Sequence, residues 1–450
     1  MSILEHFPYP TFREGQAEML QEVERKWHNH DVIVLILPTG WGKTVAAYTI
    51  ADWAGEATTV VPNNVLLRQM HKEFPDLATI EPVNTYKTRA GYLAARANLR
   101  HNKALTSYHS YLGNKAYNST IIVDEAAELV KFLKDKEAIK LWRQKENFPD
   151  NMYTTGDVME WLKSMPKPMA RHKKLLEKLD QQDDRYILEM ATEMYKGKWD
   201  ECLKLVPLTP RDNKPIMWPG LVKKIVLMSA TFNEEDLYDL GLDRMRYTII
   251  EGGSPIPPER RPFIYEPVGN VSYRNYDTIV PKLADYVLKW METHPEKGMI
   301  HAPYGLASKL RKHLKHPRLM YHSRFDKRKV LDGFLSSDPA DGRVLVGSGL
   351  TEGLSLENDL ARWQLILKVP FANLRDRAVK AKMEARPRWY QWDAVKQVMQ
   401  AAGRVSRGPE DYGITVMLDS NFERLPEDMM YTWFKEAIWY GFSDGYWNGR

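Results

Sequence analysis

The chain has 450 residues, of which 43% are hydrophobic and 27% are charged. This composition is typical of globular proteins, and the length favours about two to four domains over a single core. A single cysteine excludes a disulfide framework and any cysteine-rich metal site, which favours a reducing compartment. The formal net charge of +5 is too small to indicate a nucleic-acid partner by itself.

Membrane and secretory signals are missing from the sequence. No apolar run reaches the roughly 18–20 residues that a helix needs to cross a bilayer. Residues 1–10 do not combine a basic segment with a following apolar one, as a secretory signal would. We therefore expect a cytoplasmic protein without a membrane partner.

Short apolar runs alternate with helix-like stretches along most of the chain. They lie at 32–37, 120–123, 225–228, 298–300, 343–346, 364–369 and 414–418. Such alternation predicts an α/β fold with parallel sheets. A stretch rich in glycine and proline, 252–258, reads as a hinge between two α/β domains. We place these domains at 1–253 and 254–450.

Residues 128–206 break this pattern. The segment is rich in lysine and in helix-forming residues, and it shows no run of the buried-strand type. Leu175 and Leu179 would share one helix face, with basic side chains on another. We expect a helical insertion in the first domain. The simplest interpretation of these basic side chains is that they form the solvent-exposed face of the helix.

The segment 32–48 predicts a phosphate-binding turn between a buried strand and a helix. The turn and helix start contain Thr39, Gly40, Trp41, Gly42, Lys43 and Thr44. Gly40 and Gly42 allow backbone N–H groups to surround a phosphate at a helix N-terminus. Lys43 would then reach the β- and γ-phosphates of ATP, and the Thr44 hydroxyl would bind Mg²⁺. Leu37 stands where the full motif has its first glycine.

Two acids follow the apolar strand at 120–123. Asp124 is expected to hold Mg²⁺, and Glu125 to orient or deprotonate the attacking water. Because ligands bind at the carboxyl ends of parallel strands, these acids should meet the phosphate-binding turn.

The segment 400–408 supplies positive charge for the developing γ-phosphate. Arg404 and Arg407 are three residues apart, which puts them on one side of a helix or turn. An arginine placed in this way contributes about 10³–10⁵ in rate. Two solvent-facing arginines are the alternative.

A basic stretch at 375–390 ends in two aromatic residues and could grip a single strand. Phosphates would bind its cations, among them Arg377 and Lys380, and a base would stack on Trp389. An exposed basic helix beside core aromatics explains the stretch equally well. Arg89 and Tyr92 are a second candidate patch.

Taken together, these motifs resemble those of superfamily 2 helicases, most closely the XPD/DinG group. The resemblance rests on Phe7–Tyr9 with Arg13–Gln16, Val60–Asn64, Ser229–Thr231, His301–Tyr304, 348–353, Val369–Phe371, Trp392–Ala394, Gln400–Arg407 and Asp411–Gly413, in the family's order.

The resemblance implies two RecA-like motor domains that sandwich ATP, with an arch-like insertion in the first. It implies ATP contacts from Arg13, Gln16, Thr39, Glu352 and Gly353. Gln400 would join the two arginines as a catalytic residue, and Asn63 would contact nucleic acid. The expected partner is single-stranded or tailed DNA, with 5′→3′ movement by a monomer.

Two departures from the family pattern affect these expectations. The four cysteines that hold an iron–sulfur cluster in XPD-type helicases are missing, so we expect no such cluster. Ala127 replaces the histidine that relays between the ATP site and Ser229–Thr231. Two alternatives therefore stay open: an RNA-directed ATPase of the same superfamily, and a nucleic-acid scaffold switched by ATP with little turnover. The sequence identifies neither a loading protein nor a pathway.

Overall fold

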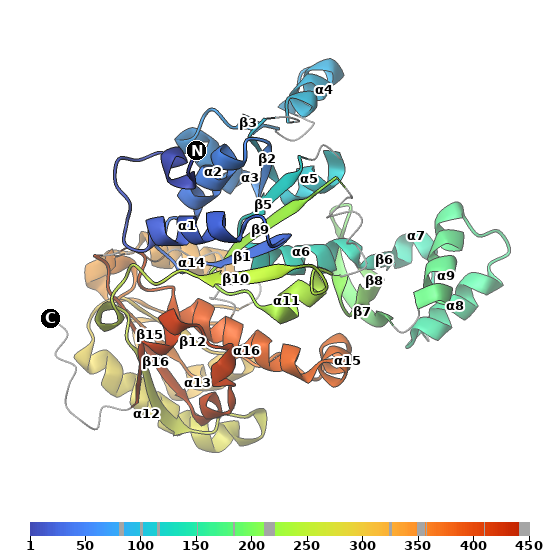
Figure 1. Ribbon diagram of the computed structural model, residues 1–450. Helices are drawn as coiled ribbons and strands as arrows, with labels where there is room; N and C mark the ends of the chain where they lie inside the picture. Colours follow the sequence, from blue (N-terminus) through green and yellow to red (C-terminus); the bar gives the residue numbers. More distant parts are fainter. Residues whose placement is uncertain are drawn as a thin grey trace.

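The computed structural model describes residues 1–80, 85–99, 102–114, 118–150, 152–182, 185–210, 221–323, 326–348, 356, 358–408 and 410–440. Within these residues the chain forms two seven-stranded sheets and one three-stranded sheet. Figure 1 shows the two large sheets as separate bodies, with the small sheet and its helices at one side. No helix of the described part is both long and apolar enough to span a membrane.

The first sheet has the strand order β10-β1-β9-β5-β2-β4-β3, and every pairing in it is parallel. Its strands are β1 (Val32–Ile36), β2 (Ala57–Val61), β3 (Ala78–Thr79), β4 (Ala104–Ser107), β5 (Thr120–Val123), β9 (Lys224–Ser229) and β10 (Tyr247–Glu251). The accompanying helices are α1 (Gln16–Lys26), α2 (Lys43–Ala54), α3 (Asn64–Glu73), α4 (Arg89–Asn98), α5 (Tyr108–Asn114), α6 (Ala126–Glu137) and α11 (Glu234–Asp239). All residues of β1, β2, β4 and β5 are buried, as expected for parallel strands covered on both faces.

The second sheet has the order β13-β14-β12-β15-β16-β11-β17 and is also parallel. Its strands are β11 (Phe263–Gly269), β12 (Gly298–His301), β13 (Leu319–Tyr321), β14 (Val344–Gly347), β15 (Trp363–Ile366), β16 (Ile414–Asp419) and β17 (Ile438–Tyr440). Its helices are α12 (Tyr276–Thr293), α13 (Tyr304–His313), α14 (Lys327–Ser336), α15 (Arg377–Ala385), α16 (Pro387–Ala402) and α17 (Thr432–Lys435). The expected α/β fold with two parallel-sheet units is therefore confirmed.

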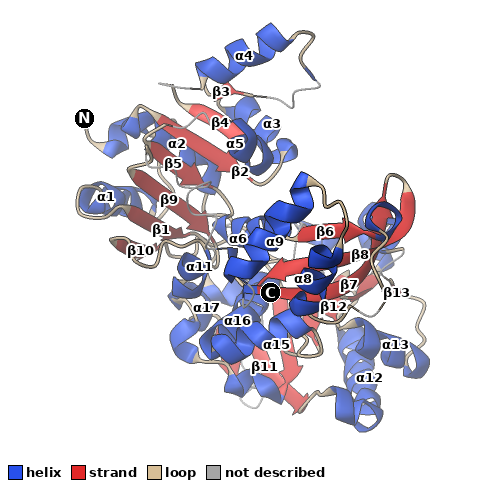
Figure 2. Cartoon of the chain, turned by 90° about the vertical axis from the view of Figure 1, so that its right-hand side faces the viewer, coloured by secondary structure: helices blue, strands red, loops and turns tan. Residues whose placement is uncertain are grey.

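The segment between β5 and β9 carries the insertion. It contains α7 (Arg143–Glu146), α8 (Thr155–Ser164), α9 (Ala170–Gln182) and the antiparallel strands β6 (Ile139–Trp142), β7 (Tyr186–Tyr195) and β8 (Lys198–Pro207). Figure 2 shows these strands beside the two longer helices. The expectation of helices without strands was wrong. Residues of β7 alternate between the core and solvent, so this strand lacks the continuous apolar run of the parallel strands.

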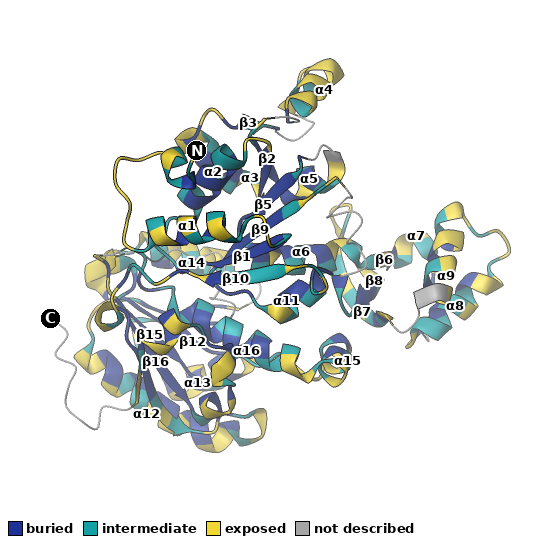
Figure 3. Cartoon of the chain, in the orientation of Figure 1, coloured by how far each residue is buried: buried dark blue, intermediate teal, exposed yellow. Residues whose placement is uncertain are grey.

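Apolar packing joins the two large sheets. One buried cluster contains Ile121 and Leu227 from the first sheet together with Phe263, Val395 and Met417 from the second unit. In Figure 3 the strands of both sheets are largely buried, whereas α4 and the outer faces of α8 and α9 are exposed. The first sheet ends at Glu251 and the second begins at Phe263. These limits support our proposal of a domain boundary near residue 254.

Candidate nucleotide-binding site

The turn between β1 and α2 is built on two glycines with left-handed backbone. Gly40 has a φ of 82°, and Gly42, which precedes the first residue of α2, has a φ of 92°. A Cβ atom on Gly42 would lie 2.9 Å from Nε2 of Gln16. The turn therefore needs glycine for conformation and for space, and it delivers Lys43 to the N-terminus of α2.

Arg13 and Gln16 brace this turn. Gln16 is buried and donates a hydrogen bond from Nε2 to the carbonyl oxygen of Trp41 at 2.7 Å. A guanidinium nitrogen of Arg13 donates to the carbonyl oxygen of Gly40 at 2.7 Å, and the backbone N–H of Arg13 donates to Oε1 of Gln16. Both residues thus lie at the nucleotide-binding turn, and their contact with adenine stays a prediction.

Two acids meet Lys43 at the carboxyl end of β5. Oε1 of Glu125 lies 3.0 Å from Nζ of Lys43, and the backbone N–H of Glu125 donates to Oδ1 of Asp124 at 2.9 Å. Glu125 has a φ of 50°, a strained value for a residue with a side chain. Such strain persists only where the surroundings enforce it, as they do at active sites.

The buried Asp124 carboxyl has too little positive charge around it. Burial and the neighbouring Glu125 raise the pKa of Asp124 to about 7, against the lowering effect of Lys43. A divalent cation would supply the missing positive charge, so this donor set fits Mg²⁺. Asp124 and the hydroxyl of Thr44, the second residue of α2, are the residues that would hold it.

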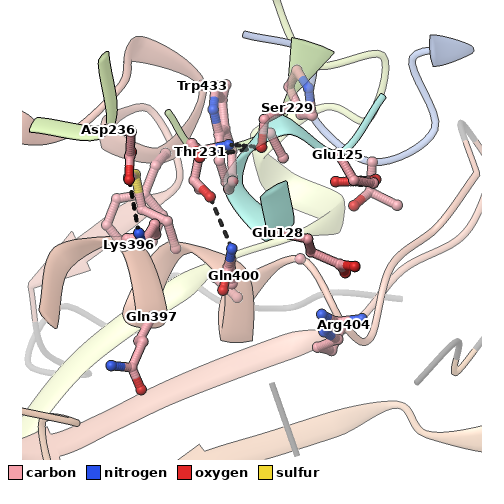
Figure 4. Close-up of a pocket in the computed structure, with 18 of the residues that line it drawn as sticks. Glu125, Glu128, Ser229, Thr231, Asp236, Lys396, Gln397, Gln400, Arg404 and Trp433 are labelled. Atoms are coloured by element: carbon pink, nitrogen blue, oxygen red, sulfur yellow. Dashed lines mark hydrogen bonds and ion pairs between the residues drawn. The ribbon is translucent and has the colours of Figure 1, made fainter. Parts of the chain in front are cut away.

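The second sheet contributes the opposite wall through the end of α16. Nε2 of Gln400 donates to Oγ1 of Thr231 at 3.0 Å, which joins α16 to the loop after β9 (Figure 4). Arg404 and Arg407 follow directly after the helix. A Cβ atom on Gly40 would lie 2.7 Å from the carbonyl oxygen of Arg407, so the two loops are in close contact.

These walls enclose a single pocket of about 620 Å³. The expected site residues that line it are Thr39, Lys43, Glu125, Trp389, Gln400, Arg404 and Arg407. Figure 4 shows Glu125 and Arg404 facing this space from opposite sides. Asp124, Thr44, Gly40 and Gly42 are not among its lining residues. Glu352 and Gly353 fall outside the residues that the structure describes.

Sequence reasoning missed several residues of this pocket, including Glu128, Asp236 and Lys396. Nζ of Lys396 lies 3.1 Å from Oδ1 of Asp236, and Nε1 of Trp392 donates to Oδ2 of the same carboxylate. The pair joins α16 to α11. Its members are 160 residues apart, so no local pattern could have found it.

The expected nucleic-acid residues are not gathered at one place. Asn63 caps α3 by accepting hydrogen bonds from the N–H groups of Val65 and Leu66. Arg89 is exposed at the start of α4, and the ring of Tyr92 packs edge-on against Tyr86. The structure therefore gives Asn63 a local role and leaves the patch on α4 open to solvent.

The basic stretch at 375–390 is largely engaged within the protein. A guanidinium nitrogen of Arg377 donates to the carbonyl oxygen of Tyr153 in the insertion at 2.6 Å. Lys380 lies 3.9 Å from Glu384 in an exposed pair, and the ammonium of Lys382 lies 4.3 Å from the ring centre of Trp389. Of the three residues expected to bind a strand, Arg377 and Lys380 are exposed and Trp389 is half-buried, and Arg377 bonds to the insertion.

This geometry defines a P-loop protein with two parallel-sheet units facing one pocket. Comparisons with known proteins agree with it. Residues 10–152 match the family of the type III restriction enzyme res subunit, and residues 299–437 match the helicase C-terminal domain.

Curated relatives match over short segments. The XPD helicase subunit of general transcription and DNA repair factor IIH is 29% identical over 99 residues in Dictyostelium discoideum, covering 20% of this chain and 13% of that protein. The XPD/RAD3 subunit of Saccharomyces cerevisiae is 31% identical over 83 residues, covering 17% of this chain and 11% of that protein.

Solved structures match over almost the whole chain. Xpd4 of S. tokodaii superposes with a TM-score of 0.61 at 16% identity, covering 95% of this chain and all of the other. An XPD helicase structure superposes with a TM-score of 0.62 at 15% identity, covering 96% of this chain and all of the other. The chain therefore has the fold of the XPD helicases and carries a helicase C-terminal domain.

Proposed function

We propose that this protein is an ATP-dependent helicase or translocase that couples ATP hydrolysis to movement on single-stranded DNA in the 5′→3′ direction. The observation that carries the proposal is the shared pocket, which Lys43 and Glu125 line from the first sheet and Arg404 and Arg407 from the second unit. The names of the relatives, which include DNA repair and telomere helicases, support DNA as the partner. We also propose that the chain acts as a monomer inside the cell, and its single cysteine supports the absence of an iron–sulfur cluster.

Hydrolysis would use the residues of both walls. Lys43 binds the β- and γ-phosphates, and in doing so it exchanges its ion pair with Glu125 for the nucleotide. Glu125 is then free to orient the attacking water and accept its proton. Arg404 and Arg407 stabilise the charge that develops on the γ-phosphate. Mg²⁺, when held by Thr44 and Asp124, neutralises phosphate charge.

Movement would follow from the separation of the two walls. The arginines bind the γ-phosphate only when the pocket is closed, so release of this phosphate removes one attraction between the two walls. A strand that contacts both units is then advanced once per cycle. The hydrogen bond between Gln400 and Thr231 connects α16, which precedes Arg404 and Arg407, to the first sheet and would transmit this change.

The test is ATPase activity with and without single-stranded DNA or RNA. We expect strong stimulation by DNA, and a loss of about 10³-fold or more in kcat for Glu125→Gln with nucleotide binding retained. Glu292→Gln, an exposed charge change on α12, is the matched control and should keep full activity. Activity indifferent to every polynucleotide would refute the proposal.

Two further outcomes separate the alternatives. Stronger stimulation by RNA than by DNA would indicate an RNA-directed ATPase. Tight ATP binding without turnover would favour the scaffold that ATP switches, an idea supported by Ala127 in place of the relay histidine. Duplexes with a 5′ or a 3′ single-stranded tail then test polarity, and unwinding from the 3′ tail would contradict the expected direction.

A further inference from the structure

An amide side chain lies buried in the middle of the second sheet. Gln364 of β15 is 0% exposed, and its neighbours on the strand are Trp363, Leu365 and Ile366. A buried amide is costly unless its polar atoms are all bonded. The Gln364 amide therefore needs specific hydrogen-bond partners within the protein.

Three hydrogen bonds satisfy the Gln364 amide. Nε2 donates to the carbonyl oxygen of Ala401 at 2.7 Å and to Oγ1 of Thr415 at 2.7 Å. Oε1 pairs with Nε2 of His301 at 2.8 Å. Both amide hydrogens are thus used, and the carbonyl oxygen has a donor.

The Ala401 carbonyl fixes the direction of this amide, because a carbonyl oxygen only accepts and must face the amide N–H groups. Oε1 of Gln364 then faces His301. Burial, together with the nearby Arg404 guanidinium, lowers the pKa of His301 to about 4, despite the bond to Gln364. The imidazole is therefore neutral near pH 7, and its one ring proton lies on Nε2, where it meets Oε1.

The Ala401 carbonyl is also the anchor of the arginine-bearing turn. It accepts a second hydrogen bond from the backbone N–H of Arg404 at 3.0 Å. One carbonyl oxygen thus joins the buried amide on β15 to the residue that enters the nucleotide pocket. Movement of this carbonyl would move the backbone from which the Arg404 side chain extends.

We propose that Gln364, with His301 bonded to its carbonyl oxygen, is a positioning residue that holds Arg404 at the γ-phosphate site. This inference rests on the proposed function of Arg404. Gln364→Met keeps the length and apolar volume of the side chain but removes both donors to Ala401 and Thr415. The turn then loses its fixed attachment to the sheet, while the Lys43 side of the pocket is unchanged.

The experiment measures DNA-stimulated ATPase kinetics of Gln364→Met in two backgrounds. In the otherwise wild-type chain we expect kcat to fall about tenfold or more, with KM and the Kd of a non-hydrolysable ATP analogue within twofold. In the Arg404→Ala background the same substitution should change the residual kcat less than twofold, because the residue it positions is gone.

Val416→Ala is the matched control for lost packing. Val416 is buried on β16 next to Leu365, and its truncation disturbs the same sheet without touching Ala401. We expect it to lower Tm at least as much as Gln364→Met does, with kcat within threefold of wild type.

Two results overturn the positioning role alone. One is an equal fold-loss from Gln364→Met in both backgrounds, and the other is an equal loss of kcat in Val416→Ala. A wild-type chain that hydrolyses no ATP under any condition would overturn the proposed function and this inference together.

Discussion

Gly40 and Gly55 both have a positive φ but lie in very different surroundings. Their φ values are 82° and 77°, but a Cβ atom on Gly40 would meet the Arg407 carbonyl oxygen at 2.7 Å, whereas one on Gly55 would have no atom within 4 Å. Alanine at either position costs about 1–2 kcal/mol of backbone strain. We expect only Gly40→Ala to lower ATPase activity strongly as well, because it pushes apart the two loops of the pocket.

Steady-state kinetics and urea unfolding of both variants check this expectation. Gly55→Ala is the control, since it carries the strain without the clash. Equal kinetic losses in the two variants would show that strain, and not contact with the Arg407 loop, limits activity.

The buried His301 predicts a stability that depends on pH. Its pKa is about 4 in the folded chain, against an ordinary value of 6.5, so the unfolded chain binds the proton more readily. The neutral ring therefore contributes fully above about pH 6.5, and this contribution is lost as the pH falls towards 4. The loss reaches about 3 kcal/mol at most.

Urea unfolding of wild type and His301→Gln at several pH values between 7 and 4 measures this contribution. The difference in unfolding free energy between the two chains should shrink or reverse as the pH falls. A difference that is constant over this range would show that His301 is protonated equally in both states.

Residues in contiguous motifs were found from sequence, whereas partners distant in the chain were not. Lys43, Glu125 and Arg404 each lie in a short stretch whose spacing indicates its chemistry, and the structure places all three at one pocket. Gln364 bonds to His301 and Ala401, which are 63 and 37 positions away. Only the topology of the second sheet brings those three residues together.

At the scale of elements, α11 is joined to α15 and α16 by buried charges. Nζ of Lys382 lies 2.6 Å from Oδ2 of Asp239, and Arg386 pairs with both Asp239 and Glu235. Lys382 and Asp239 are almost fully buried. Charges desolvated to this degree depend on each other, because neither can be solvated by water.

We expect Lys382→Met to destabilise the folded chain by about 3 kcal/mol, since it leaves Asp239 buried with less compensation. Lys380→Met is the matched control on the same helix. Its pair with Glu384 is exposed, so it should change the stability by about 0.5 kcal/mol or less. Chemical denaturation of both variants gives the comparison, and equal effects would show that burial does not govern this ion pair.

Elements were predicted best where their pattern is continuous. The buried runs of β1, β5 and β9 are unbroken and were predicted as strands. The strands β3 and β7 were not predicted. β3 has only two residues, and in β7 apolar residues alternate with polar and charged ones, so neither shows a continuous apolar run. β3 pairs with β4, which is distant in the sequence, whereas β7 pairs with β8 directly across the short turn at Lys196 and Gly197.

At the scale of the whole molecule, the insertion belongs to the first sheet by sequence but also touches the second unit. It leaves after α6 and returns before β9, yet Arg377 of α15 donates to the Tyr153 carbonyl and α15 contacts β7. Neither contact involves the nucleotide pocket. The insertion therefore adds a contact between the two units that is separate from the loops of the pocket and from the buried charges of α11.

The insertion is part of the first unit in sequence and is hydrogen-bonded to the second unit through Tyr153. In the proposed cycle, separation of the units requires either a shift of the insertion or the breaking of the hydrogen bond between Arg377 and Tyr153. Loss of a phosphate at the pocket would then be coupled to α8 and α9, which lie at one side of the molecule (Figure 1).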